Sequence, residues 1–192
     1  MAGLTPDDCY RDLVIPFFDG AMVARLSALC ERRIGDGDFI RYDDYKTPEE
    51  FSNVLEDIPE IGDFAASAVV GCRPLLMFLP PGFSMAVHRD LHWGGNRQCS
   101  IVVMAYPLGG IAPTNFYLDE SRDSLAVSSG WHHGQCKLLN IKQWHNVDNA
   151  GTWRANLQLS IDTDYRDVVG LIGDNALFRG HDCGFTQTQG RK

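Results

Sequence analysis

The sequence lacks paired cysteines, long apolar runs and basic clusters, and each absence excludes a class of protein. Six cysteines are scattered over 192 residues without a Cys-x-x-Cys pair, which argues against a zinc knuckle or a redox dithiol. No apolar run approaches the ~20 residues needed to cross a bilayer, and residues 1–12 lack the basic and apolar regions of a signal peptide. We therefore expect a soluble, cytoplasmic protein with reduced, buried thiols.

Charge limits the partners that the chain is expected to bind. The sequence has 25 acidic and 17 basic residues, a net charge of −8, and no basic cluster larger than a pair such as Arg32 and Arg33. Nucleic-acid binding depends on neutralising phosphates with cations, so neither nucleic acid nor an anionic membrane is expected as a partner. A small-molecule, amino-acid or peptide substrate is the expected partner, and the oligomeric state is left open.

Length and composition favour one domain over residues 1–192. With 44% hydrophobic residues, a chain of this size can bury a core without disulfides. The texture of the sequence changes near residue 73 and again near residue 166. We expect helical support from 1–72, a barrel core from 73–166 and a C-terminal extension from 167–192.

The first part of the chain has helix signals at several places. Asp19 is a candidate N-cap for a helix with apolar residues at helical spacing that ends at Gly35. Residues 47–50, with the sequence Thr-Pro-Glu-Glu, have the pattern of a capping box. A third helix is expected over 61–70 and a short strand over 39–42.

From residue 73 onwards the pattern changes to short strands separated by glycine, proline and asparagine. This punctuation predicts an antiparallel barrel or jelly roll, with the helices packed on one face. The expected strands are 74–79, 84–90, 98–106, 114–118, 137–145 and 153–162.

His88 and Asp90 are the first candidate metal ligands. Residues two apart on a strand project to the same face, about 6.6 Å apart at ~3.3 Å per residue, so both side chains can reach one ion. His145 ends a later strand-like run, 55 residues after Asp90. Two imidazoles and one carboxylate on one side of a metal leave positions open, as non-haem Fe(II) oxygenases require. A surface strand end with an ion pair is the plainer alternative for His88 and Asp90.

Arg154 is the fourth element of this pattern and lies on the next strand. Polar residues alternate with apolar ones from 154 to 161, which predicts a polar face toward the cavity and an apolar face toward the helices. A guanidinium can bind a carboxylate through two parallel hydrogen bonds, and inside a barrel it needs an anion. A sheet with one solvated face is the alternative.

Together these residues resemble the Fe(II)- and 2-oxoglutarate-dependent dioxygenases, in particular the prolyl and aspartyl/asparaginyl hydroxylase-like members. The segments that carry the resemblance are 80–90, with a glycine six residues before His88, and 144–149 followed by Arg154. It spans about residues 75 to 165. It implies a mainly β, cupin-like jelly roll, the double-stranded β-helix, with N-terminal helices.

The resemblance also implies an activity. Fe(II) would be held by His88, Asp90 and His145, and Arg154 would bind the distal carboxylate of 2-oxoglutarate. With O2, such an enzyme releases succinate and CO2 and hydroxylates an unactivated C–H bond of an amino acid, peptide or small metabolite. The carboxylate ligand favours a hydroxylase over the related halogenases, in which a small residue replaces it. A non-catalytic or differently metallated cupin-like protein is the alternative.

Further candidates are less distinctive. Asn156, on the polar face of its strand, and Tyr117 or Asn115 are candidates to contact 2-oxoglutarate. Arg97 is a candidate for its primary carboxylate, for a substrate carboxylate or for an ordinary surface ion pair. His92 and Trp93 are candidates to contact the substrate. A structural or solvated role is expected for His132, His133 and His181.

Overall fold

Two antiparallel sheets form the body of the protein. The computed structural model describes residues 3–39, 54–90, 97–149 and 151–186. The larger sheet has the strand order β2-β8-β3-β6-β1-β9 and the smaller one β5-β4-β7. The strands are β1 (Tyr10–Val14), β2 (Cys72–Leu79), β3 (Cys99–Tyr106), β4 (Thr114–Tyr117), β5 (Leu125–Ser129), β6 (Cys136–Leu139), β7 (Trp144–Val147), β8 (Arg154–Ile161) and β9 (Gly184–Phe185).

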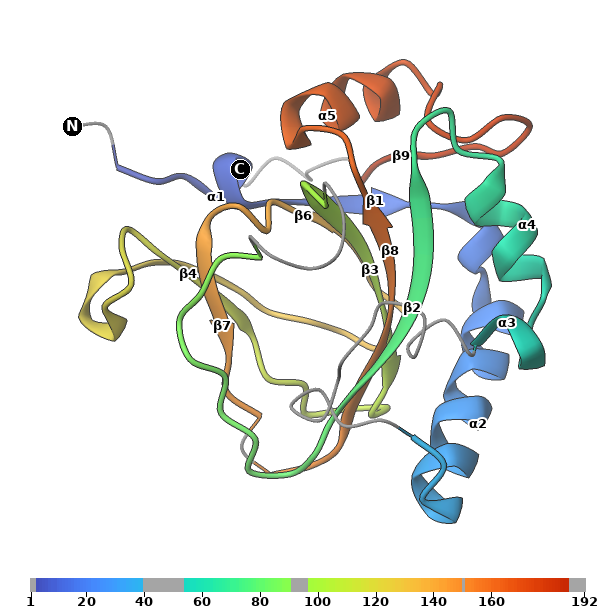
Figure 1. Ribbon diagram of the computed structural model, residues 1–192, viewed down its shortest axis with the longest axis horizontal. Helices are drawn as coiled ribbons and strands as arrows, with labels where there is room; N and C mark the ends of the chain where they lie inside the picture. Colours follow the sequence, from blue (N-terminus) through green and yellow to red (C-terminus); the bar gives the residue numbers. More distant parts are fainter. Residues whose placement is uncertain (1–2, 40–53, 91–96, 150, 187–192) are drawn as a thin grey trace, which may run out of the picture.

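Helices cover the outer face of the larger sheet (Figure 1). The longest is α2 (Gly20–Asp36), and the others are α1 (Pro6–Cys9), α3 (Val54–Asp57), α4 (Glu60–Ala66) and α5 (Tyr165–Gly173), with short 3-10 turns at Pro16–Phe18 and Arg122–Ser124. The expected N-cap is confirmed, because the Asp19 carboxylate accepts a hydrogen bond from the Met22 amide at 2.9 Å. None of the described helices combines the length and the apolar character needed to cross a bilayer.

Strand β8 shows why the sheet has one apolar and one polar face. Ala155, Leu157, Leu159 and Ile161 belong to the core between the sheet and the helices. The alternating residues Arg154, Asn156 and Gln158 line a cavity on the other face. The alternation expected from the sequence is therefore confirmed, since a slip of one residue would bury the polar set against the helices.

The boundaries of several elements differ from the expected ones. Residues 10–14, expected within helical support, form β1 and pair with β6 in the larger sheet. The expected strand 137–145 is two strands, because a turn at 140–143 separates β6 from β7. In that turn the Gln143 amide donates to the Asn140 carbonyl at 3.2 Å, and the Asn140 carboxamide donates to the Asp8 carbonyl at 2.9 Å. Asparagine favours such a turn through its side-chain hydrogen bonds.

The helix ends also differ. Helix α2 continues past Gly35 and ends before Gly37, which has a φ of 71° in the left-handed region. Helix α4 ends at Ala66, four residues earlier than expected. Helix α5 was not expected and crosses the proposed boundary at 166. The expected helix opened by residues 47–50 and most of the strand 39–42 lie outside the described residues.

The expected strand 84–90 is extended chain along β7 that pairs irregularly. Two isolated bridges join Ser84 to Asp148 and His88 to His145. Ser84 and His88 are four positions apart, whereas their partners His145 and Asp148 are three positions apart. One extra residue on one strand is the pattern of a β-bulge. Around them, the Met85 amide donates to the Val147 carbonyl at 3.0 Å. The segment thus forms an edge beside the smaller sheet and faces the larger one.

Candidate functional site

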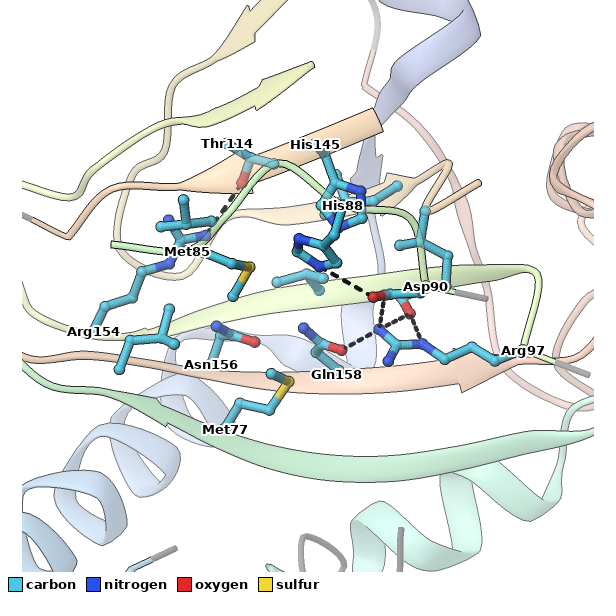
Figure 2. Close-up of a pocket in the computed structure, with 16 residues that line it drawn as sticks. Met77, Met85, His88, Asp90, Arg97, Thr114, His145, Arg154, Asn156 and Gln158 are labelled. Atoms are coloured by element: carbon cyan, nitrogen blue, oxygen red, sulfur yellow. Dashed lines mark hydrogen bonds and ion pairs between the residues drawn. The ribbon is translucent and has the colours of Figure 1, made fainter. Parts of the chain in front are cut away.

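A cavity between the two sheets brings together most of the candidate residues. The larger sheet contributes residues of β2, β3, β6 and β8, and β4, β7 and the extended segment contribute others (Figure 2). Its lining residues are Met77, Leu79, Met85, His88, Asp90, Arg97, Ser100, Val102, Thr114, Leu139, Ile141, His145, Val147, Arg154, Asn156 and Gln158. The expected triad and Arg154 therefore share one cavity.

His88 and His145 face each other across two neighbouring chain segments. Each backbone amide donates to the other residue's carbonyl, at 3.0 and 2.9 Å. The two imidazole rings consequently lie on the same face of the paired segments, with their centroids 4.5 Å apart. Asp90 completes the group, because ligand atoms of all three residues lie within 4.8 Å of one another. His88 and His145, which are 57 positions apart in the sequence, are thus joined by backbone pairing.

Both imidazoles are oriented by the backbone in the same way. His88 Nδ1 lies 2.8 Å from the Ala86 carbonyl, and His145 Nδ1 lies 2.9 Å from the Gln143 carbonyl. A carbonyl only accepts, so each Nδ1 carries the proton. In the neutral rings this leaves the Nε2 lone pairs available as metal ligands.

Asp90 is held between a histidine and an arginine. Its Oδ1 lies 3.2 Å from His88 Nε2, and its Oδ2 lies 3.0 Å from Arg97 Nη2. Burial opposes ionisation of this carboxyl group, but the charge of Arg97 and the hydrogen bond with His88 outweigh burial and hold its pKa well below the usual range. Asp90 is therefore ionised at neutral pH.

The two histidines differ in basicity. Burial lowers the pKa of His145 to about 4, and this effect outweighs the attraction of the Asp90 charge. Burial also acts against the charged form of His88, but the hydrogen bond and charge of Asp90 outweigh it and raise the pKa of His88. His145 is thus neutral at physiological pH, as a metal ligand must be.

Arg154 lies at the opposite end of the cavity from the triad (Figure 2). Its Nη1 donates to the Ala112 carbonyl at 2.8 Å and its Nη2 to Thr114 Oγ1 at 3.3 Å, while its Nε has no hydrogen-bond partner among the described residues. The side chain also lies near the Trp131 ring, 5.6 Å from its centroid. Burial lowers the pKa of Arg154 to about 9, and no carboxylate pairs with it in the described part of the chain.

Between Arg154 and the triad, β8 presents two carboxamides to the cavity. Asn156 is buried, and its Oδ1 has no partner among the described residues. Gln158 accepts a hydrogen bond from Arg97 at 2.8 Å. Gln158 and Thr114 were not singled out from the sequence. The alternation on β8 placed Gln158 on the cavity face, whereas no sequence signal distinguished Thr114 from its neighbours.

Tyr117 and Asn115 do not line the cavity, contrary to expectation. The Tyr117 hydroxyl donates to Asn146 Oδ1 at 2.9 Å, and the Asn115 carboxamide contacts the same oxygen at 3.3 Å. On β4 it is Thr114 that reaches the cavity, while Phe116 is buried in an apolar cluster. Successive strand residues alternate between faces, so Thr114 and Tyr117 point to opposite sides.

The remaining candidates have structural surroundings. Ser27 Oγ lies 2.8 Å from Nε2 of His133, and the ring of His181 packs edge-on against Phe17 and Phe64. Within the described ranges, only the triad brings three metal-ligating side chains together. Near the turn at 140–143, Leu139 and Ile141 line the cavity. His92, Trp93 and Asn96 lie outside the described residues.

Comparison with known proteins identifies the fold. No family model and no curated protein matches the sequence. Among solved structures, the chain is similar to a prolyl-4-hydroxylase from Pseudomonas putida, with a TM-score of 0.50 and 16% identity over 79% of this chain and 92% of that one. The chain has the fold of that hydroxylase. The likeness confirms the expected architecture at the level of antiparallel sheets with supporting helices.

Two further structures are similar over most of the chain. AviO1 from Streptomyces viridochromogenes Tue57 matches with a TM-score of 0.46 and 18% identity, and the match covers 78% of this chain and 89% of the AviO1 chain. The iron-bound EctD of S. alaskensis matches with a TM-score of 0.45 and 13% identity, and the match covers 81% of this chain and 76% of the EctD chain.

Proposed function

We propose that this protein is a non-haem Fe(II)- and 2-oxoglutarate-dependent oxygenase built on a double-stranded β-helix. It hydroxylates an unactivated C–H bond of an amino acid, peptide or small metabolite and releases succinate and CO2. The observation that carries the proposal is one cavity with a His-Asp-His group on one side and, on the other, a buried arginine that has no carboxylate partner among the described residues. The fold of a prolyl-4-hydroxylase supports it.

The donor set fits Fe(II). Two neutral imidazole Nε2 atoms and one ionised carboxylate are the ligands of the facial triad, which leaves positions open for co-substrates. A closed structural zinc site would use four ligands, often thiolates, and the described cysteines are apart from this group. Bound there, iron would supply the activation of O2 and the oxidation of the substrate.

The other end of the cavity fits a carboxylate. An unpaired buried cation is costly, and the orphaned Nε of Arg154 adds an unsatisfied donor to that cost. One end of a dicarboxylic 2-oxo acid neutralises the cation and accepts hydrogen bonds from it. Thr114 and Trp131 hold the guanidinium in place from the side of the smaller sheet.

The protein's own residues do three things in the reaction. The histidine Nδ1–H groups donate to backbone carbonyls, which keeps the proton on Nδ1 and the Nε2 atoms available. Arg154 orients the co-substrate along β8 toward the triad. Apolar residues around the cavity, such as Met77, Met85 and Val147, exclude water and limit side reactions. Asp90, as a carboxylate ligand, leaves no vacant position in the triad for a halide, which supports hydroxylation over halogenation.

Anaerobic titration with Fe(II) and 2-oxoglutarate tests the proposal. We expect a weak visible charge-transfer band in the wild type and its loss in Arg154→Ala, because this variant lacks the anion clamp. The matched control is Arg179→Ala, at an arginine that does not line the cavity, and it should keep the band. A wild-type protein that binds Fe(II) without ever producing the band is a differently metallated or non-catalytic cupin-like protein, and the proposal fails.

The triad is tested separately by substitution. His88→Ala, Asp90→Ala and His145→Ala should each abolish succinate formation linked to a substrate, found by screening amino acids and peptides. Circular dichroism checks that each variant is folded. Retained turnover in any one of them would show that the assigned residue is not a ligand.

A further inference from the structure

We infer that Arg97 is a positioning residue for the metal centre: it holds one oxygen of Asp90 so that the other oxygen alone faces the ion. The inference rests on the proposed function. It differs from the roles that the sequence suggests for Arg97, which are to bind the primary carboxylate of 2-oxoglutarate, to bind a substrate carboxylate or to form an ordinary surface ion pair.

The shortest contacts of Asp90 with its two partners involve different carboxylate oxygens. Oδ1 faces His88 Nε2 at 3.2 Å, on the side where ligand atoms of the triad converge. Oδ2 faces Arg97 Nη2 at 3.0 Å. The side chains of Asp90 and Arg97 are only 6% and 14% exposed, so water competes little for either. Figure 2 shows Arg97 on the far side of Asp90 from the two imidazoles.

Arg97 is itself held in place by two strands of the larger sheet. Its Nε and Nη2 lie 3.2 and 3.1 Å from Ser100 Oγ on β3, and Nη2 donates to Gln158 Oε1 on β8 at 2.8 Å. A planar guanidinium with several fixed hydrogen bonds has little freedom to follow a moving carboxylate. The orientation of Asp90 is therefore tied to the larger sheet, although Asp90 belongs to the extended segment beside the smaller one.

The division of oxygens has a consequence for coordination. If both oxygens of Asp90 bound the ion, the second would occupy a position that the co-substrates need. With Oδ2 on Arg97, Asp90 contributes one oxygen and the triad keeps its open face. Partners that orient ligands in this way are typically worth 10–100-fold in metal affinity.

A competing effect has the opposite sign. Arg97 is a cation near the ion, and its removal alone would raise the affinity for a divalent metal by reducing repulsion. The inference is that orientation outweighs repulsion, because a buried Asp90 without Arg97 loses the contact that fixes its geometry. The sign of the change in affinity therefore distinguishes a positioning role from a mere neighbouring charge.

The experiment is a titration with Co(II) alone, followed by its visible absorption, on the full chain. We expect Arg97→Gln to weaken binding about 10-fold or more and to change the spectrum at saturation. Arg97→Lys, which keeps a cation but loses the fork of donors, should be intermediate. The matched control is Arg89→Gln, which also removes a positive charge and lies between the two ligands in sequence. The Arg89 side chain is exposed, and its guanidinium carbon lies over the Trp144 ring, 4.4 Å from the ring centroid.

The outcomes separate the two claims. Weaker binding in Arg97→Gln with wild-type behaviour in Arg89→Gln supports the inference. Equal or tighter binding in folded Arg97→Gln overturns it and leaves the proposed function standing. Failure of the wild type to bind Co(II), or binding that survives in His145→Ala, contradicts the proposed function itself.

Discussion

Arg154 shows at the scale of a single residue how a functional group is maintained at a cost to stability. It is 3% exposed, has two hydrogen bonds to the protein and has no carboxylate partner among the described residues. Selection for stability alone favours an apolar residue here, since a buried, incompletely paired charge is commonly worth less than an apolar side chain of similar size.

We therefore expect Arg154→Met to stabilise the ligand-free protein by about 1–2 kcal/mol while abolishing binding of 2-oxoglutarate. Urea denaturation gives the change in the free energy of unfolding, and the charge-transfer band reports binding. Asn156→Leu is a useful comparison, because it removes another buried polar group with an orphaned oxygen from the same strand. Clear destabilisation by Arg154→Met would mean that the protein itself already neutralises the cation.

Helix α2 shows at the scale of an element how two nearby glycines can have opposite effects. Gly35 lies inside the helix, and a Cβ added there would meet nothing within 4 Å. Gly37 follows the helix with a φ of 71°, and its amide donates to carbonyls of Arg33 and Ile34. A side chain is favourable at the first position and strained at the second, although both sites are open.

Gly35→Ala is expected to raise the free energy of unfolding by up to about 1 kcal/mol, because alanine reduces the freedom of the unfolded chain and suits a helix. Gly37→Ala is expected to lower it by about 1 kcal/mol, because alanine disfavours the left-handed conformation. Thermal and urea unfolding of the two variants provide the measurement. The same sign for both would place the end of the helix elsewhere.

At the scale of the whole molecule, the proposed metal centre joins parts of the chain that are distant in sequence. His88 and Asp90 lie on the extended segment, His145 lies on β7, and Arg97 connects the site to β3 and β8. Apolar clusters of buried residues lie beside the polar groups of the cavity. The unfolded chain cannot assemble this ligand set, so metal binding stabilises the folded state selectively.

Co(II) at about 100 times its dissociation constant should therefore add about 2.7 kcal/mol to the free energy of unfolding. The gain should disappear in Asp90→Ala and persist in His132→Ala, which removes an exposed histidine. Thermal unfolding with and without the metal measures it. An equal gain in Asp90→Ala would point to a metal site elsewhere on the protein.

The sequence alone was sufficient for features that depend on local order. The N-cap at Asp19, the alternation along β8 and the approximate positions of β2, β3 and β4 follow from side-chain chemistry and periodicity. A His-x-Asp pair alone is common, and the candidate ligands were indicated by the order and spacing of His88, Asp90, His145 and Arg154 together. Strand β1 and the turn at 140–143 were missed, because five residues of mixed polarity carry little periodicity and the turn depends on a contact with Asp8.

Only the tertiary structure decided which side chains meet. Tyr117 and Thr114 lie on one short strand, and the sequence does not indicate which of them faces the cavity. Alternation along a strand shows which residues share a face, but only the neighbouring sheet decides which face meets the cavity. Likewise, Arg97 is one of several arginines in the sequence, and its pairing with Asp90 arises where β3 and β8 pass the extended segment. The sequence by itself determined which chemical groups the chain carries and how they alternate along each strand. The packing of distant segments determined which of these groups meet and in what geometry.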